Sequence, residues 1–378
     1  MFVSAGEVSG DHYAASAARA LKSKGFHGRI YGLCGEESRT GGIIEALWNN
    51  DILHLMGISE VFGAIGAIWN LLGELKRNIL KTRPDAVVVA DSPDFHLPLV
   101  RSLRRNGYAG KIFYIAPPSV WAWRKYRART LAKYVDVCFP LFAFEHDALT
   151  ARGCDSRWMG HPLVEEFINP DIKRGEVVKN ITGSPVGDRA IAALLPGSRR
   201  SEIEPLYPVL SALYRLLDAN GAAPVFSVAP GLSAAARKFL TGRLAASGER
   251  YYEGPGRRLM GAADVVVGAS GTATAEALLL RRYMVVMYKV SFFSGVVGRL
   301  LLRGVKFALP NILAGEYFYP ELLQKRATAE NAMACASDWL NESARRREER
   351  TRAMDELAAK MGRPGAAAFW AEQILGEL

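Results

Sequence analysis

A short, uncharged run of aliphatic residues that ends in a carboxylate places one strand of the fold. Residues 86–90 read Ala-Val-Val-Val-Ala, and Asp91 opens the sequence Asp-Ser-Pro-Asp-Phe that follows. A run that is apolar at every position predicts a strand buried on both faces, as in parallel sheets covered by helices. The carboxyl end of such a strand is where open α/β sheets bind ligands. Asp91 is therefore a candidate general base, and Asp94 is its rival.

Strand and helix patterns alternate through both halves of the chain. Its 378 residues are too many for one ordinary core, so we expect two domains. The alternation predicts βαβ units and an α/β fold class, with two doubly wound, Rossmann-like domains that face each other across a cleft. Strands are expected at 2–5, 29–33, 85–90, 111–116, 135–139, 157–159, 190–195, 224–228, 250–253, 264–268 and 283–288.

A polar segment at 169–188 separates the two halves. It contains two Pro, three Gly and mixed charges, which is typical of a linker. We therefore expect an N-terminal domain over 1–168 and a C-terminal domain over 189–350. The residues from 351 to 378 are expected to form helices that return to the N-terminal domain.

The composition limits the classes of molecule that the protein is expected to bind. The net charge of +10 favours anionic ones, but Lys and Arg are not interleaved with aromatic residues as in nucleic-acid modules, so no nucleic acid is expected. The four cysteines form no CxxC pair and the six histidines no HxH or HExxH pattern, so we expect reduced thiols in a cytosolic protein and no metal site. The first residues lack the pattern of a signal peptide.

Three glycine-containing turns follow predicted strands. The first, Ala-Gly-Glu-Val-Ser-Gly-Asp at 5–11, fits an anion or sugar site at a helix start and an ordinary strand-to-helix turn equally well. The second, Leu-Pro-Gly-Ser-Arg-Arg-Ser-Glu-Ile at 195–203, favours a phosphate site over a capped helix with surface arginines. Gly197 and Ser198 can present backbone N–H groups there, and Arg199 can bind a pyrophosphate through two hydrogen bonds.

The third turn, at 268–276, places Ser270, Gly271 and Thr272 at the start of a helix. Glu276 follows one turn later on the same face, where a carboxylate can bind a ribose diol. The alternative is a capped helix with a surface glutamate. Together, the second and third turns predict a nucleotide diphosphate site in the C-terminal half.

Two further features, a tryptophan pair and a histidine, are candidates for a second binding site. Trp121 and Trp123 precede a basic helix and are expected either in the core or as a platform for an anionic, partly apolar molecule. His161 comes just before the predicted linker, and is therefore expected near the cleft.

An apolar stripe at helical spacing runs through 58–80 and includes Val61, Phe62, Ile65 and Trp69. Its longest uncharged run, 61–73, has 13 residues, whereas a helix that spans a bilayer needs about 20. Such a stripe is usually core, but its basic end allows contact with an anionic membrane surface. The segment 291–306 offers a second such combination.

In their joint order, these motifs resemble those of the lipid-A-disaccharide synthase family, bacterial glycosyltransferases of the two-domain GT-B type. The resemblance rests on AGEVSGD (5–11), LMGISEV (55–61), DSPDF (91–95), PPSVWAWR (117–124), MGHPL (159–163), LPGSRRSEI (195–203), ASGTATAE (269–276) and PNILAGE (310–316). The family transfers diacylglucosamine from its UDP derivative to the 6-hydroxyl of diacylglucosamine 1-phosphate. It forms the β-1,6-linked disaccharide phosphate with inversion and releases UDP.

By this resemblance, Asp91 matches the family's proposed catalytic aspartate and Arg199 its essential arginine, and no metal or other cofactor is implied. The UDP-sugar would be bound in the C-terminal domain by Ser198, Ser270, Gly271, Thr272, Glu276 and Asn311. The acceptor would lie in the N-terminal domain near Gly6, Glu7, Ser9, Asp11, Trp121 and His161. The helix after LMGISEV would contact the membrane.

The resemblance also implies a cytoplasmic protein that is peripheral on the inner membrane and contacts anionic lipids there; a homodimer stays open. Two alternatives remain at this stage. One is another UDP-sugar enzyme of this architecture, such as a UDP-N-acetylglucosamine epimerase or a peptidoglycan glycosyltransferase. The other is a lipid-binding protein on a degenerate transferase fold.

Overall fold

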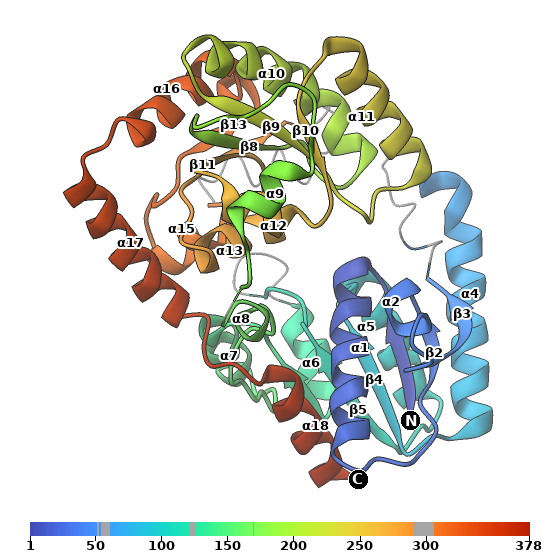
Figure 1. Cartoon of the computed structure of the whole chain (residues 1–378). Coiled ribbons are helices and arrows are strands. Elements are labelled where there is room, and N and C mark those ends of the chain that lie inside the picture. Colours follow the sequence, from blue (N-terminus) through green and yellow to red (C-terminus); the bar gives the residue numbers. More distant parts are fainter. Residues whose placement is uncertain (51–52, 54–60, 121–125, 169, 290–305) are drawn as a thin grey trace. The chain divides into compact units, whose positions relative to one another are not determined.

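The computed structural model describes residues 1–50, 53, 61–120, 126–168, 170–289 and 306–378 (Figure 1), without the side chains of 61–65. The chain divides into two compact units. Unit 1 comprises Met1–Ile168 with Met361–Leu378, and unit 2 comprises Asn169–Lys360. The prediction of two parallel-sheet α/β units is confirmed.

Unit 1 is a sheet of strands with helices on both of its faces. Its strands are β1 (Phe2–Ala5), β2 (Tyr31–Cys34), β3 (Glu45–Asn49), β4 (Ala86–Ala90), β5 (Lys111–Ile115) and β6 (Val137–Phe139). Its helices are α1 (Val8–Ser23), α2 (Glu36–Arg39), α4 (Val61–Thr82), α5 (Pro93–Arg105), α6 (Arg127–Tyr134), α7 (Ala143–Thr150), α8 (Leu163–Glu166) and α18 (Ala366–Glu377).

All strand pairs of this sheet are parallel, in the order β3-β2-β1-β4-β5-β6. Chain order reverses between β1 and β4, so the loops after these two strands diverge at the carboxyl edge. In doubly wound folds this crevice is where ligands bind. Asp91 follows β4 directly and lies at this point.

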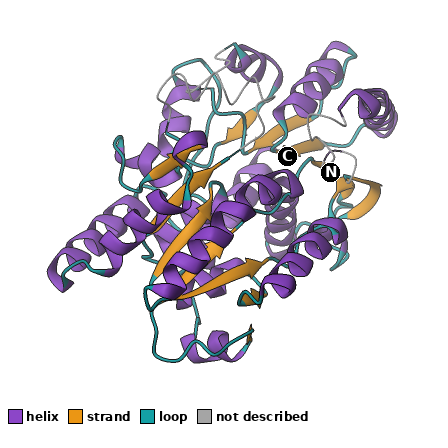
Figure 2. Cartoon of the chain, turned by 90° about the horizontal axis from the view of Figure 1, so that it is seen from above, coloured by secondary structure: helices purple, strands orange, loops and turns teal. Residues whose placement is uncertain are grey.

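The apolar run of β4 is explained by burial on both faces, because helices flank the strands of the sheets (Figure 2). Val87 and Val89 share a core cluster with residues of α4, α5 and α6, whereas Val88 and Ala90 share one with residues of α1 and α18. Full burial of a valine side chain contributes roughly 1.5–3 kcal/mol, so a polar residue at any of these positions would be costly.

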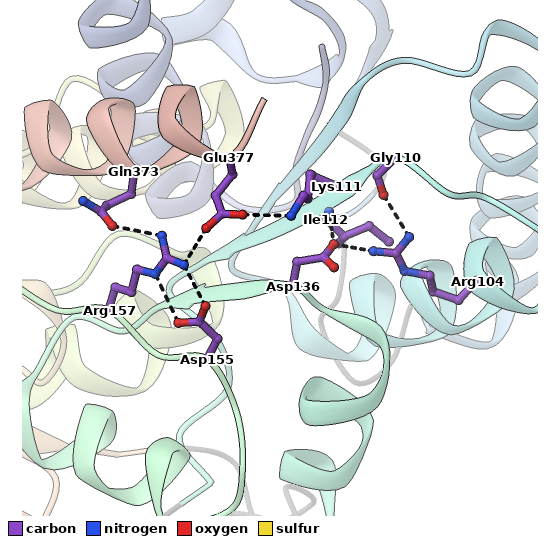
Figure 3. A network of polar contacts seen from close by, with 9 residues as sticks. All are labelled: Arg104, Gly110, Lys111, Ile112, Asp136, Asp155, Arg157, Gln373 and Glu377. Carbon is purple, nitrogen blue, oxygen red and sulfur yellow. Dashed lines mark hydrogen bonds and ion pairs between the residues drawn. The ribbon is translucent and has the colours of Figure 1, made fainter.

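Helix α18 closes unit 1, although unit 2 precedes it in the sequence. It packs along α1, and its last turn is tied to the amino edge of the sheet (Figure 3). Glu377 accepts hydrogen bonds from Lys111 Nζ at 2.8 Å and from Arg157 Nη2 at 2.6 Å, and Gln373 Oε1 accepts one from Arg157 Nη1 at 3.0 Å.

Unit 2 repeats the architecture. Its strands are β7 (Ile181–Thr182), β8 (Ile191–Leu195), β9 (Ala223–Val228), β10 (Tyr251–Glu253), β11 (Val265–Ala269), β12 (Met284–Tyr288) and β13 (Glu321–Leu323). Its helices are α9 (Arg174–Lys179), α10 (Arg200–Ala219), α11 (Ala234–Ser247), α12 (Gly256–Ala262), α13 (Thr272–Leu279), α15 (Leu309–Ala314), the 3₁₀ helix η1 (Gln324–Arg326), α16 (Ala329–Leu340) and α17 (Ala344–Ala359).

The order of this sheet is β13-β12-β11-β8-β9-β10-β7, parallel except for β7. Chain order reverses between β8 and β11, which are the two strands that lead into the Gly-Ser-Arg and Ser-Gly-Thr turns. A Cβ atom on Gly268 would lie 2.2 Å from the backbone oxygen of Leu195, so glycine allows these strands to approach closely. Both predicted turns therefore meet at one switch point.

Three sequence predictions of the fold need correction. The segment 169–188 belongs to unit 2, because Val177 is buried and Arg174 Nη1 binds Asp264 Oδ2 at 2.9 Å. Of the tail, 351–360 stays with unit 2 in α17, since Met354 and Leu357 are buried, and only the part from Met361 onward joins unit 1. The strand expected at 157–159 is reduced to a single bridge between Ser156 and Cys138, at the neighbouring position.

Candidate functional site

At the switch point of unit 1, the start of α1 meets the end of β4. Ser9 Oγ donates a hydrogen bond to Asp91 Oδ2 at 2.6 Å, and the backbone N–H of Ser92 donates to Asp91 Oδ1 at 2.7 Å. A Cβ atom on Gly10 would lie 2.8 Å from the backbone oxygen of Ala90, so glycine lets α1 begin close to Asp91. The half-buried Asp91 carboxylate is thus oriented by two donors at the carboxyl edge of the sheet.

Asp94, the rival carboxylate, has a different environment. Its side chain is 65% exposed and forms an ion pair with Arg127, whose side chain is only 6% exposed. The ion pair occupies one oxygen of the Asp94 carboxylate. Geometry therefore favours Asp91 over Asp94 as the base.

Two other residues of the first turn, Gly6 and Glu7, lie beside Asp91. Gly6 packs against Ser92, since a Cβ atom on Gly6 would lie 2.0 Å from Ser92 Oγ, and the half-buried Glu7 is the N-cap of α1. Both therefore border the Asp91 site.

Asp11, which we expected on the acceptor side, has a structural position instead. It is buried, and its carboxylate accepts hydrogen bonds from the backbone N–H groups of Gly35, Glu37 and Ser38 at 2.8, 3.0 and 3.4 Å. These are the first amides of α2, so Asp11 fastens α2 to α1 and its oxygens are used there.

His161 is also more deeply placed than the sequence suggested. Its ring is buried, lies edge-on to Tyr13 with 6.3 Å between ring centroids, and accepts a hydrogen bond from the backbone N–H of Leu163 at Nδ1. Burial lowers the pKa of His161 to about 4, so the ring is neutral at physiological pH. Trp121 lies outside the described residues.

At the switch point of unit 2, the loop after β8 exposes Ser198 and Arg199. The loop after β11 carries the half-buried Ser270, followed by the exposed Gly271 and Thr272 at the start of α13. Glu276 lies one turn into this helix and is half-buried. The structure thus brings five of the six predicted UDP-site residues to one edge of one sheet.

Glu202 modifies the predicted role of the β8 loop. Its Oε2 atom accepts hydrogen bonds from the backbone N–H groups of Ser198 at 3.0 Å and Arg199 at 3.3 Å. We expected the amides of Gly197 and Ser198 to face a phosphate, but the Glu202 carboxylate already accepts from that of Ser198. Glu202 stands three residues after the N-cap Arg199, which is the capping-box spacing, so the sequence held a signal for this contact.

Asn311, the sixth predicted residue, is buried, and both its amide nitrogen and its amide oxygen are hydrogen-bonded. Its Nδ2 donates to the backbone oxygen of Tyr319 and to Glu321 Oε1, both at 2.8 Å, and its Oδ1 accepts from the N–H of Tyr319 at 2.7 Å. An amide with these bonds supports the fold, and the contact of Asn311 with UDP stays a prediction.

The same network joins residues 307–309 to β13 and to α13. Glu321 Oε1 also accepts from the N–H groups of Phe307 and Ala308, at 3.0 and 2.8 Å, and Thr274 Oγ1 accepts from that of Leu309 at 3.3 Å. The Phe307 ring stacks on that of Tyr288, with 5.7 Å between centroids. No local sequence pattern indicates this network, because its members are separated in the chain.

Comparison with known proteins agrees with this geometry. The family model described as lipid-A-disaccharide synthetase matches residues 1–367. The lipid-A-disaccharide synthase of Anaeromyxobacter dehalogenans (strain 2CP-C) is 35% identical over 378 residues, which is 100% of this chain and 97% of the relative. That of Myxococcus xanthus is 34% identical over 380 residues, covering 99% and 96%.

The chain belongs to the lipid-A-disaccharide synthase family. It is therefore an enzyme, a UDP-sugar-dependent glycosyltransferase of lipid A synthesis. Among solved structures, a Neisseria meningitidis UDP-GlcNAc 2-epimerase bound to UDP-GlcNAc superposes with a TM-score of 0.66 at 11% identity, covering 99% of both chains. An E. coli trehalose-6-phosphate protein bound with UDP-2-fluoro glucose has a TM-score of 0.55 at 14% identity, covering 100% and 98%. At these identities the likeness shows the shared GT-B fold.

Among the described side chains of α4, the residues of the apolar stripe lie on two faces of the helix, one buried and one exposed. Leu71, Leu75 and Ile79 are buried in the core of unit 1, whereas Trp69 is 62% exposed. The predicted contacts Val61, Phe62 and Ile65 lie where side chains are not described. Within the described residues, no helix is long and apolar enough to cross a bilayer.

Proposed function

We propose that the protein joins UDP-2,3-diacylglucosamine to 2,3-diacylglucosamine 1-phosphate, with inversion, and forms the β-1,6-linked lipid A disaccharide 1-phosphate and UDP. Family membership supports the reaction class. The observation that carries the assignment of roles is the Asp91 carboxylate, oriented by Ser9 and Ser92 at the switch point of unit 1.

In the proposed reaction, Asp91 takes the proton of the acceptor's 6-hydroxyl as that oxygen attacks the anomeric carbon of the donor. The bond from this carbon to the diphosphate breaks, and its electron pair leaves with UDP. Attack on the face opposite the leaving group converts an α-linked donor into a β-linked product. Ser9 supports the base, because its hydrogen bond fixes one carboxylate oxygen and leaves the outer lone pairs of the carboxylate for the hydroxyl.

The donor would bind at the switch point of unit 2. Arg199 and Ser198 would contact the diphosphate together with Ser270, Gly271 and Thr272, and the amino terminus of α13 favours the negative charge that develops on UDP. Glu276 would bind the ribose diol. This chemistry needs the acceptor hydroxyl and the anomeric carbon of the donor in contact during transfer.

Acylated substrates would reach the enzyme at a lipid surface. The exposed Trp69 on the basic-ended helix α4 suits contact with anionic lipids, and Val61, Phe62 and Ile65 precede it on the same helix. We propose a peripheral position on the cytoplasmic face of the inner membrane.

The test offers the purified protein the diacylated donor, the diacylated acceptor, a 6-deoxy form of that acceptor and, separately, UDP-N-acetylglucosamine. Mass spectrometry should detect a disaccharide 1-phosphate from the two diacylated substrates, and NMR should show its β linkage. A 6-deoxy acceptor, in which hydrogen replaces the 6-hydroxyl group, should give no product. Disaccharide from the 6-deoxy acceptor, or an α linkage, would contradict the proposal, and epimerisation of UDP-N-acetylglucosamine without an acceptor would favour the alternative enzyme.

A further inference from the structure

The backbone at Asp91 has an unusual conformation. Asp91 and Ser92 have φ angles of 57° and 45°, in the left-handed region that residues other than glycine rarely adopt. Two such residues in succession persist only when surrounding contacts hold them there, and such positions concentrate at functional sites. The contacts that hold Asp91 are therefore informative about its task.

Two buried side chains hold the Asp91 backbone oxygen. His96 Nδ1 lies 2.7 Å from this oxygen, and the hydroxyl of Tyr114 donates to it at 2.9 Å. On the other side of the residue, the N–H of Asp91 donates to the backbone oxygen of Ile115 at 3.0 Å. Both peptide groups that flank the Asp91 side chain are thus fixed.

A third residue fixes the His96 ring. Because a carbonyl oxygen only accepts hydrogen bonds, Nδ1 must carry the proton, and Nε2 then accepts from Ser4 Oγ at 2.8 Å. Ser4 and His96 are both fully buried. Burial lowers the pKa of His96 to about 4, which keeps this neutral tautomer throughout the physiological range.

We infer that His96 and Tyr114 are positioning residues, which hold the left-handed backbone of Asp91 so that its carboxylate stays aimed at the acceptor hydroxyl. Neither side chain would touch substrate, since both are enclosed in the core and donate to the backbone oxygen of Asp91, not to its carboxylate. The inference rests on the proposed role of Asp91 as the base. It adds that the catalytic geometry depends on the tautomer of a core histidine.

The first experiment replaces each donor. Tyr114→Phe and His96→Leu each remove one hydrogen bond to Asp91, and we expect kcat to fall roughly 10- to 100-fold, because small displacements of a catalytic group are costly. KM for both substrates should stay within about twofold, since binding groups are untouched. His96→Asn keeps an N–H donor close to the position of Nδ1 and should recover most of the loss.

Tyr108→Phe is the matched control. Tyr108 is also a buried tyrosine of unit 1, and its hydroxyl donates to the backbone oxygen of Pro84 at 2.7 Å, at the opposite edge of the sheet. It should lose similar stability in thermal unfolding and keep its kcat. An equal fall in kcat for Tyr108→Phe and Tyr114→Phe would overturn the inference.

A double-mutant comparison separates positioning from a general structural role. If His96 acts through Asp91, His96→Leu added to Asp91→Asn should lower the residual rate no further. A further fall by the factor seen in the wild-type background would refute the inference, whereas a wild-type rate for Asp91→Asn alone would refute the proposed function itself. Where His96→Leu does not fold, Tyr114→Phe takes its place in the same comparison.

Discussion

The burial of Trp370 predicts that helix α18 contributes several kcal/mol to the stability of unit 1. Its side chain is 2% exposed, packs among Val88, Ala90 and Phe113, and meets the Tyr13 ring edge-on with 6.2 Å between centroids. A tryptophan buries about 200 Å² of largely apolar surface, which at about 25 cal/mol/Å² is roughly 5 kcal/mol. Since alanine retains a small part of this, Trp370→Ala should lower the free energy of unfolding of unit 1 by about 3–5 kcal/mol.

Urea denaturation followed by circular dichroism measures this change, with Trp69→Ala as the matched control. Trp69 belongs to the same unit but is 62% exposed, so the same substitution there should change the free energy of unfolding by less than about 0.5 kcal/mol. The unit 2 transition should not move in either variant. Equal effects of the two substitutions, or an unchanged unit 1 transition in Trp370→Ala, would refute the assignment of α18 to the core of unit 1.

Three further predictions follow from single groups. Hydrogen bonds that the protonated His12 ring donates to Glu166 and Glu37 raise the pKa of His12 to about 9. Its stabilising contribution should therefore be complete below about pH 6.5 and lost as pH rises through 9, and a His12→Gln variant whose stability follows the wild-type pH profile between about 6.5 and 10 would contradict this. Glu202→Gln keeps an acceptor for the loop amides but removes a charge that repels the diphosphate, so UDP should bind roughly fivefold tighter by calorimetry, and weaker binding would contradict the electrostatic argument. Asp94→Asn should keep kcat within about threefold of wild type, because its carboxylate is engaged in an ion pair.

The sequence predicted the frame of the fold because its signals are local. The run of β4 is apolar at every position since both faces of the sheet are covered, and the same holds for β8 and β11. Once these strands are placed, the turns that end in Asp91 and Arg199 must lie at carboxyl edges. The sequence motifs therefore indicated the carboxyl edges, whereas the strand order that makes them switch points comes from the structure.

The functions of individual polar side chains were less predictable, because they depend on partners distant in sequence. Asp11 and Asn311 are polar residues in motif-like segments, yet their hydrogen bonds are used by α2 and by Tyr319. The linker prediction failed for the same reason, since a polar composition does not reveal that Arg174 binds Asp264. Likewise, nothing local to His96 indicates that it holds Asp91.

The central claim is that Asp91 is the base, and the rate of disaccharide formation by Asp91→Asn tests it most directly. Asparagine preserves the size of the side chain and can still accept the hydrogen bond of Ser9, but it cannot take a proton. With Asp94→Asn as the neighbouring control, we expect kcat of Asp91→Asn to fall by at least about 10²–10⁴-fold at unchanged stability. A rate within about threefold of wild type, or a larger loss in Asp94→Asn, would contradict the account.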